Sequence, residues 1–239
     1  MHEMNFKNWK EFKSGLKDRV EGSHAGINLN NFLFRGQADS KWHLWSSFDR
    51  IEKNKAKYNI LINNFKKICN YYNHNEELFK NDDKVIAAYA QHYGLPTRLL
   101  DWTSSPYFAA FFAFSTAKTI KTNATKCTIW GINKESESLK MKSGIEFISL
   151  PSNKFNYRMK NQIGHFTLSN HTEDSLDDFD SALIKSTKID DLLWKLNLPV
   201  SEMDAVLADL EFMGINYSTV YPDIQGYIEE SIFKSDIIK

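Results

Sequence analysis

The stretch AYAQHYGLPTRLLDWTSSPYFAAFFA, residues 88–113, decides how this 239-residue chain folds. Most of this stretch is apolar, which predicts that it is buried, yet it contains His92, Arg98 and Asp101. A buried ionised side chain costs several kcal/mol unless a partner neutralises it. These groups, with Arg35 further upstream, must therefore pair with one another or bind a ligand.

Local signals divide this stretch into three parts. Residues 84–93 have helical spacing, and the glycine that follows predicts the end of that helix. Residues 95–102 contain a proline and little periodicity, which predicts a loop. Ser105 and Pro106 supply an N-cap and a proline at the first helical position, so a helix is expected over residues 107–117.

Apolar periodicity extends the prediction over the rest of the chain. Helical spacing occurs in residues 5–21, 56–72 and 201–213. Alternation predicts strands at 29–37, 126–133, 145–150 and 163–168. The five acidic residues between positions 173 and 180 predict a solvated loop.

These elements predict an α+β fold with a mixed, largely antiparallel central sheet and flanking helices. No linker rich in Pro, Gly or Ser divides the chain, which favours one domain over residues 1–239. In that domain the helix at 5–21 packs on the edge, and a helical insert covers about residues 50–93.

Composition excludes several classes of protein. Thirty basic residues balance thirty acidic ones, so no global field attracts nucleic acid or an anionic membrane. The two cysteines match neither a zinc site nor a disulfide framework, which favours a reducing cytoplasm. The N-terminus lacks the apolar region of a signal peptide, and no run approaches the roughly 18 apolar residues of a spanning helix. We therefore expect a soluble cytoplasmic protein with no membrane partner.

Common catalytic motifs are absent from the sequence. It has no phosphate-binding P-loop, no Gly-x-Gly-x-x-Gly turn, no His-Glu-x-x-His and no Gly-x-Ser-x-Gly. The seven histidines are scattered, so no metal site is predicted.

The first candidate site is Arg35 with Gly36. The spacing places Arg35 near the end of a strand, beside a residue without a side chain, and its fork of donors suits a phosphate or carboxylate. The alternative is a structural salt bridge to Asp101. The two interpretations are compatible, because an aspartate that orients an arginine also supports a binding site.

The second candidate site follows Asp101. Hydroxyls of Thr103, Ser104 and Ser105 come directly before a helix, whose free N–H groups can bind an anion. The alternative is that Ser105 only caps the helix while Asp101 holds the preceding loop. His92, in the last turn of the preceding helix, is explained equally well by the helix dipole.

The third candidate site pairs Arg158 with Gln162, four residues apart and leading into a strand. The Gln162 amide both donates and accepts hydrogen bonds, so it suits an amide or ribose edge. Alternatively, it bonds the backbone where the strand begins.

Together these blocks resemble the FRG domain family, a widespread and mostly bacterial group named for its Phe-Arg-Gly motif. The resemblance covers about residues 25–230. It is carried by Phe34-Arg35-Gly36-Gln37, by the block from Gln91 to Pro106, by Arg158-x-x-x-Gln162-x-Gly164-x-Phe166, and by Leu210-x-x-x-Gly214 followed by Tyr221-Pro222-Asp223.

The order of the motifs is also distantly similar to ADP-ribosyltransferases, in which an arginine or histidine on the first strand grips NAD and a Ser-Thr-Ser-like strand supports the pocket. This resemblance implies a split sheet, NAD as the substrate, and catalytic positions at Arg35 and Gln162. It implies substrate contacts from Gly36, His92, Arg98, Asp101, Thr103, Ser104 and Arg158.

The chain departs from that pattern at the third motif, where a glutamate normally holds the ribose. Gln162 stands there, with Glu146 and Glu173 as alternatives. Glutamine cannot act as a general base, which leaves binding without turnover open.

The resemblance therefore implies an NAD- or nucleotide-binding domain. It would transfer ADP-ribose to an unidentified protein or nucleic acid in a bacterial toxin or phage-defence setting. The alternative is a non-enzymatic interaction or effector module whose motifs are structural.

Overall fold

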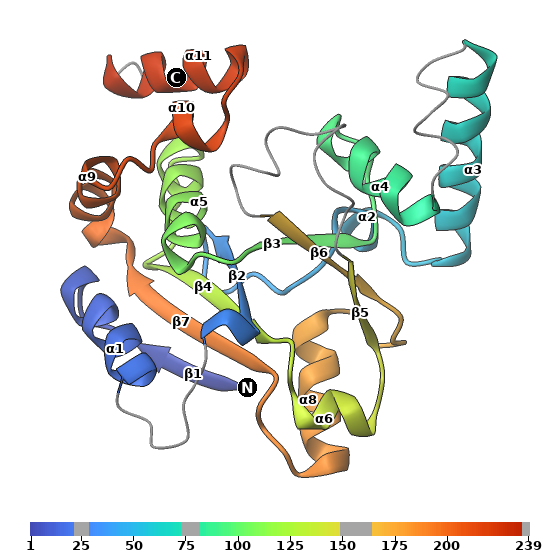
Figure 1. The fold of residues 1–239 in the computed structure, drawn as a ribbon, viewed down its shortest axis with the longest axis horizontal. Coiled ribbons are helices and arrows are strands. Elements are labelled where there is room, and N and C mark those ends of the chain that lie inside the picture. The colour runs from blue at the N-terminus through green and yellow to red at the C-terminus, as the bar shows by residue number, and fades with distance from the viewer. Residues whose placement is uncertain (22–28, 73–81, 149–163, 236–239) are drawn as a thin grey trace.

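The computed structural model describes residues 1–21, 29–72, 82–148 and 164–235. They form a seven-stranded sheet with the order β1-β7-β4-β2-β3-β6-β5 (Figure 1). The strands are β1 His2–Asn5, β2 Phe32–Gln37, β3 Leu99–Thr103, β4 Lys126–Asn133, β5 Ile145–Ile148, β6 Gly164–Ser169 and β7 Leu193–Pro199. Only the β1–β7 pair is parallel among these strands, which confirms the α+β prediction of a mixed, largely antiparallel sheet.

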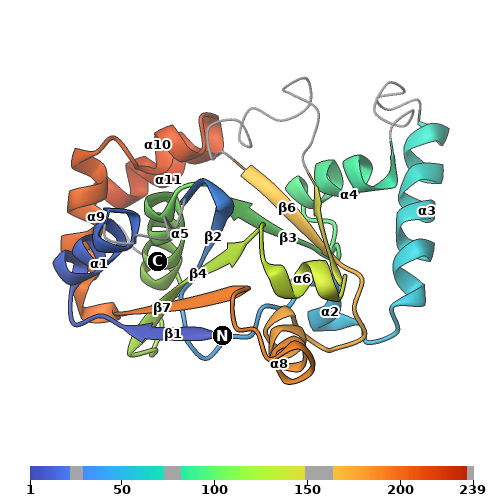
Figure 2. The same cartoon turned by 60° about the horizontal axis from the view of Figure 1, so that its bottom comes forward.

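Helices pack around this sheet in three groups. The helices are α1 Trp9–Glu21, α2 Ser47–Ile51, α3 Ala56–Tyr71, α4 Asp83–His92, α5 Pro106–Thr119, α6 Glu137–Met141, α8 Leu176–Thr187, α9 Met203–Phe212, α10 Tyr217–Val220 and α11 Ile224–Lys234. Figures 1 and 2 show α3 and α4 on one side of the molecule and α1, α5 and α9 on the other, with α6 and α8 together near β5.

Alternation along β2, which predicted this strand, assigns its side chains to two separate cores. Phe32 and Phe34 join a core with residues of α1, α5 and α9. Leu33 joins a second core with residues of α8, such as Phe179. A third core joins α3 and α4 to β3, β5 and β6. Because both faces of the central strands are covered, a polar residue there must have a partner or line a cavity.

Gly36 is required by the packing of α5 on β2. A Cβ at this position would lie 1.9 Å from the carbonyl oxygen of Ala109 and 2.7 Å from the nitrogen of Ala113. Gly36 pairs with Ile129 of β4 inside a regular strand. The missing side chain of Gly36 therefore makes room for a helix within a regular strand.

Residues 95–102 are not a loop throughout, because their second half forms β3. Leu99, Leu100 and Trp102 are buried, and β3 pairs antiparallel with β6 along its whole length. Burial on both faces removes the alternation that marks a half-exposed strand. The proline at 96 precedes the strand and does not interrupt it.

The acidic segment 173–180 is not a solvated loop. Ser175 caps α8 by accepting a hydrogen bond from the nitrogen of Asp178, and Asp178 lies in the first turn, where the helix dipole favours a carboxylate. Asp180 is fully buried and forms an ion pair of 3.1 Å with the amino group of Met1. The acidic residues therefore begin a helix that covers the sheet.

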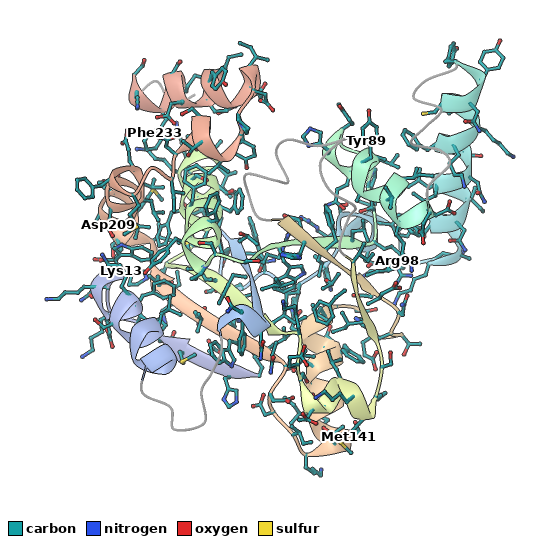
Figure 3. All side chains as sticks on the ribbon, in the orientation of Figure 1. Lys13, Tyr89, Arg98, Met141, Asp209 and Phe233 are labelled. Atoms are coloured by element: carbon teal, nitrogen blue, oxygen red, sulfur yellow. The ribbon has the colours of Figure 1, made fainter. Side chains whose placement is uncertain are left out.

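The N-terminal and C-terminal parts of the chain meet at one sheet edge. The predicted helix at 5–21 begins only at Trp9, because residues 2–5 pair with β7, a strand absent from the prediction. Lys13 of α1 lies 2.7 Å from Asp209 of α9, and the Trp9 indole donates to the same carboxylate (Figure 3).

Within the described ranges, no helix combines the length and apolar character needed to cross a bilayer. Cys69 and Cys127 are both buried and unpaired with each other.

Candidate functional site

A cleft of about 400 Å³ lies between α4 and α5. Residues of β2, β3 and β6 line it, α4 and α5 contribute its sides, and residues from the segments after β2 and α10 complete it. Its polar and charged lining residues are Arg35, Gln37, Arg50, Gln91, His92, Asp101, Thr103, Thr116 and His165. This volume is within the range of small-molecule sites.

The sheet opens at this cleft because β2 and β3 share a single register pair, Phe34 with Thr103. Beyond that pair, the Arg35 side chain joins the two strands. Its Nη1 donates to the backbone oxygen of Asp101 at 2.8 Å and to the carboxylate Oδ1 at 2.6 Å. The structural salt bridge considered from the sequence is therefore present, and both of its residues line the cleft.

The two members of this pair differ in exposure. The Arg35 side chain is 15% exposed, whereas that of Asp101 is 62% exposed. Desolvation by neighbouring residues raises the pKa of Asp101, but the charge and hydrogen bond of Arg35 outweigh it and hold that pKa below its ordinary value of 3.8. Asp101 is therefore an ionised carboxylate that faces the open space of the cleft.

Arg50 of α2 is a second guanidinium in the cleft, and sequence reasoning missed it. Its Nε donates to the oxygen of Ser46 at 3.4 Å, and it forms no ion pair with any residue that the structure describes. Partial burial, and then the positive charge of Arg35, lower its pKa, although an arginine stays protonated near neutral pH. An exposed arginine in a five-residue helix gives no local signal of function.

Charges in the cleft do not cancel. Among the described lining residues, Arg35 and Arg50 are cations and Asp101 is the carboxylate. Burial, followed by the charge of Lys134, lowers the pKa of His165, which favours its neutral form. The cleft thus carries an excess positive charge that attracts an anionic ligand.

Aromatic side chains form part of the cleft wall. Trp42 is 43% exposed, and Phe112 and Tyr221 meet edge to face with ring centroids 6.2 Å apart. An exposed indole face offers a surface on which a base or a nicotinamide ring can stack. Tyr221 belongs to the closing motif seen in the sequence, whereas nothing in the sequence marked Trp42.

The residues before α5 have separate roles. Thr103 lines the cleft, and its hydroxyl accepts a hydrogen bond of 3.2 Å from the nitrogen of Ser105. Ser104 does not line the cleft. Its Oγ lies 2.9 Å from Nε2 of His165, and His165 does line the cleft. Ser105 caps α5, as predicted. Helix α5 lines the cleft with Phe112 and Thr116, and its first turn does not line the cleft. The cleft therefore contains no anion site at the N-terminus of α5.

The end of α4 contributes Gln91 and His92 to the cleft. Gln91 accepts a hydrogen bond from the Thr97 hydroxyl, which fixes its amide. The structure therefore brings together Arg35, Gly36, His92, Asp101 and Thr103 of the predicted site.

Arg98 does not line the cleft. Its Nε lies 3.4 Å from Asp49 Oδ1, and its Nη2 donates to the backbone oxygen of Ser169 at 2.8 Å. Figure 3 shows it beside the sheet on the side of α3, away from α5. The predicted substrate contact is replaced by a brace between α2 and β6.

The third motif cannot be placed in the cleft. Arg158 and Gln162 lie outside the described residues. Glu146 pairs with Lys84, and Glu173 lies 3.4 Å from His171, so neither of the alternative glutamates lines the cleft.

A smaller cavity of about 160 Å³ adjoins the cleft. The two share Arg35, Arg50, Gln91 and Asp101, and the smaller one adds the Ser47 hydroxyl. The charged residues Arg35, Arg50 and Asp101 therefore line both spaces.

Comparison with known proteins gives one match. Residues 30–122 match a family model described as FRG domain. The matched range includes Arg35 and the block from 91 to 106 and ends before the third and closing motifs, so it confirms the resemblance for that range. Neither the search of curated proteins nor the search of solved structures gave a match.

Proposed function

We propose that this chain, whose residues 30–122 match the FRG domain model, binds an NAD-like nucleotide in the cleft between α4 and α5. The observation that carries the proposal is Arg50, an arginine without an ion-pair partner among the described residues, next to the Arg35–Asp101 pair.

The lining suits the parts of a nucleotide. Guanidinium groups bind phosphate oxygens with paired donors, and Arg50 has donors not used by the described residues. Trp42 supplies a stacking face, and the Gln91 amide lies in the same lining, where ribose hydroxyls need partners. A cleft of this size takes a nucleotide in part, with the rest open to solvent.

Transfer of ADP-ribose to a macromolecule is the second step of the proposal and rests on the motif order alone. Asp101 is the carboxylate that lines the cleft in the described residues, and it already accepts a hydrogen bond from Arg35. Release of nicotinamide on incubation with NAD and bacterial lysate, lost in Arg35→Gln, would support transfer. Tight binding without such release would limit the function to recognition.

Calorimetric titration with NAD tests the binding step. We expect saturable binding by the native protein and at least about tenfold weaker binding by Arg50→Gln, since a charge-assisted bond to phosphate contributes about 1.5–3 kcal/mol. Lys140→Gln is the matched control, because Lys140 pairs with Glu137 on the exposed face of α6, away from the cleft lining. Equal affinity of both variants would show that Arg50 does not hold the ligand.

The alternative of a non-enzymatic interaction or effector module keeps support from two observations. Gly36 serves the packing of α5, and Arg98 braces α2 against β6. Under that alternative Arg35 is also structural, so Arg35→Gln would unfold the protein and no nucleotide would bind. A folded Arg35→Gln variant with lost NAD binding would contradict it.

The toxin or phage-defence setting is proposed by resemblance alone. Growth arrest in bacteria that express the chain, relieved by Arg50→Gln, would support it. Normal growth during expression of the native chain would count against a toxin.

A further inference from the structure

Asp101 presents an unused carboxylate oxygen to the cleft. Its Oδ1 accepts from Arg35, whereas Oδ2 accepts no hydrogen bond from any other residue that the structure describes. The backbone oxygen of Asp101 also accepts from Arg35, so the guanidinium is held even without that carboxylate. The carboxylate is therefore free to serve a second positive group.

Arg50 presents the opposite charge to the same space. Both Arg50 and Asp101 line the cleft and the smaller cavity beside it. Arg50 and Asp101 are close enough for their charges to interact, yet they form no direct ion pair. A ligand that enters thus meets a positive and a negative group side by side.

This inference rests on the proposed function and names the charge pattern of its ligand. We propose that the cleft selects a nucleotide whose phosphates lie near a cationic ring, as in oxidised NAD, over the same nucleotide with a neutral ring. Arg50 binds the phosphates, and Asp101 faces the positive ring. A purely anionic ligand such as ADP-ribose is attracted by Arg50 and repelled by Asp101.

The exposure of the Asp101 side chain limits the expected preference for NAD⁺ over NADH. Asp101 is largely open to solvent, and ion pairs in such positions contribute at most about a fivefold change in affinity. The comparison therefore needs ligands of equal shape. NAD⁺ and NADH meet this need, because they differ in the charge of one ring.

The test is calorimetric titration of the native protein and of Asp101→Asn with NAD⁺, NADH and ADP-ribose. We expect the native protein to bind NAD⁺ about threefold to fivefold more tightly than NADH, and Asp101→Asn to bind the two equally. Asparagine keeps the backbone acceptor for Arg35, and a melting curve establishes that the variant is folded.

The outcomes separate this inference from the proposed function. Equal binding of NAD⁺ and NADH by the native protein overturns the inference and leaves nucleotide binding intact. Absence of binding by all three ligands at millimolar concentration overturns both. If Asp101→Asn does not fold, the native NAD⁺ to NADH ratio, and its decrease with added salt, decides the matter.

Discussion

Residues 30–122, which match the FRG domain model, contain two arginine–aspartate pairs that share their chemistry and differ in their surroundings. In the Arg98–Asp49 pair the side chains are 14% and 12% exposed, and the nearest atoms are 3.4 Å apart. In the Arg35–Asp101 pair the arginine is enclosed, but the aspartate opens into a cleft that Arg50 also lines. In the first pair the two charges face each other inside the protein, although Arg98 Nε and Asp49 Oδ1 form no hydrogen bond, whereas the second pair leaves charge available to a ligand.

Exposure therefore distinguishes a structural pair from a binding site more clearly than residue type does. Both pairs join separate elements, α2 to the sheet in one case and β2 to β3 in the other. Each stabilises the fold to some degree. Variants of the two pairs should thus differ in the balance between lost stability and lost binding.

The largest effect is expected from Arg98→Ala. It leaves Asp49 buried without its cation and removes a hydrogen bond to Ser169, which should lower the free energy of unfolding by about 3–5 kcal/mol. Urea denaturation followed by fluorescence measures it. Lys140→Gln, on the exposed face of α6, is the control and should change little. A loss below about 1 kcal/mol would show that this pair is not a brace.

The second-largest effect is expected from acid, which should lower the free energy of unfolding by protonating His171 near the Arg98–Asp49 pair. Burial lowers the pKa of His171 from 6.5 to about 4, with the charge of Arg98 among the smaller contributors. The folded protein then binds fewer protons than the unfolded chain, so stability falls as pH decreases from 6.5 toward 4, by roughly 2–3 kcal/mol.

The measurement compares the native protein with His171→Gln over this range of pH. Burial raises the pKa of Asp180 to about 6, and its titration has the opposite sign, so only the difference between the two proteins reports His171. Parallel curves would contradict this assignment. The Arg35–Asp101 pair titrates at a lower pH, because the pKa of Asp101 lies below 3.8. Its contribution to stability is lost only as the pH falls through that lower value.

A smaller loss of stability is expected from Arg35→Gln. Water can solvate the exposed Asp101 carboxylate once its partner is gone, so the cost should be about 1–2 kcal/mol, well below that of Arg98→Ala. Thermal melting of the two variants under the same conditions gives the ranking. Equal destabilisation would remove the distinction between the two pairs.

Sequence reasoning found α4 and α5 through local signals at their ends, but it missed helices α8 and α11 as well as strands β1, β3 and β7. Gly94 and Ser105 mark the boundaries of α4 and α5, and both signals act within one turn of chain. Strand β3 was missed because Leu99 and Leu100 are buried on opposite faces, and β1 because its polar residues gain order only by pairing with β7. Such pairing depends on residues almost 200 positions away.

The site was predicted in the same uneven way. Arg35 and Asp101 were identified because charged residues in apolar sequence need a partner, and that partner proved to be each other. The same argument placed Arg98 in the site, because sequence cannot tell which aspartate it meets. Arg50 sits in an ordinary polar sequence, and only the fold brings it to the cleft.

The central claim is that the cleft between α4 and α5 binds a nucleotide through Arg50. The most direct measurement is calorimetric titration of NAD into the native protein and into Arg50→Gln, a variant expected to lose less than about 0.5 kcal/mol of stability because its side chain is exposed. We expect saturable binding by the native protein and at least about tenfold weaker binding by Arg50→Gln, with an unchanged melting temperature. No binding by the native protein at millimolar NAD, or equal binding by both proteins, would contradict it.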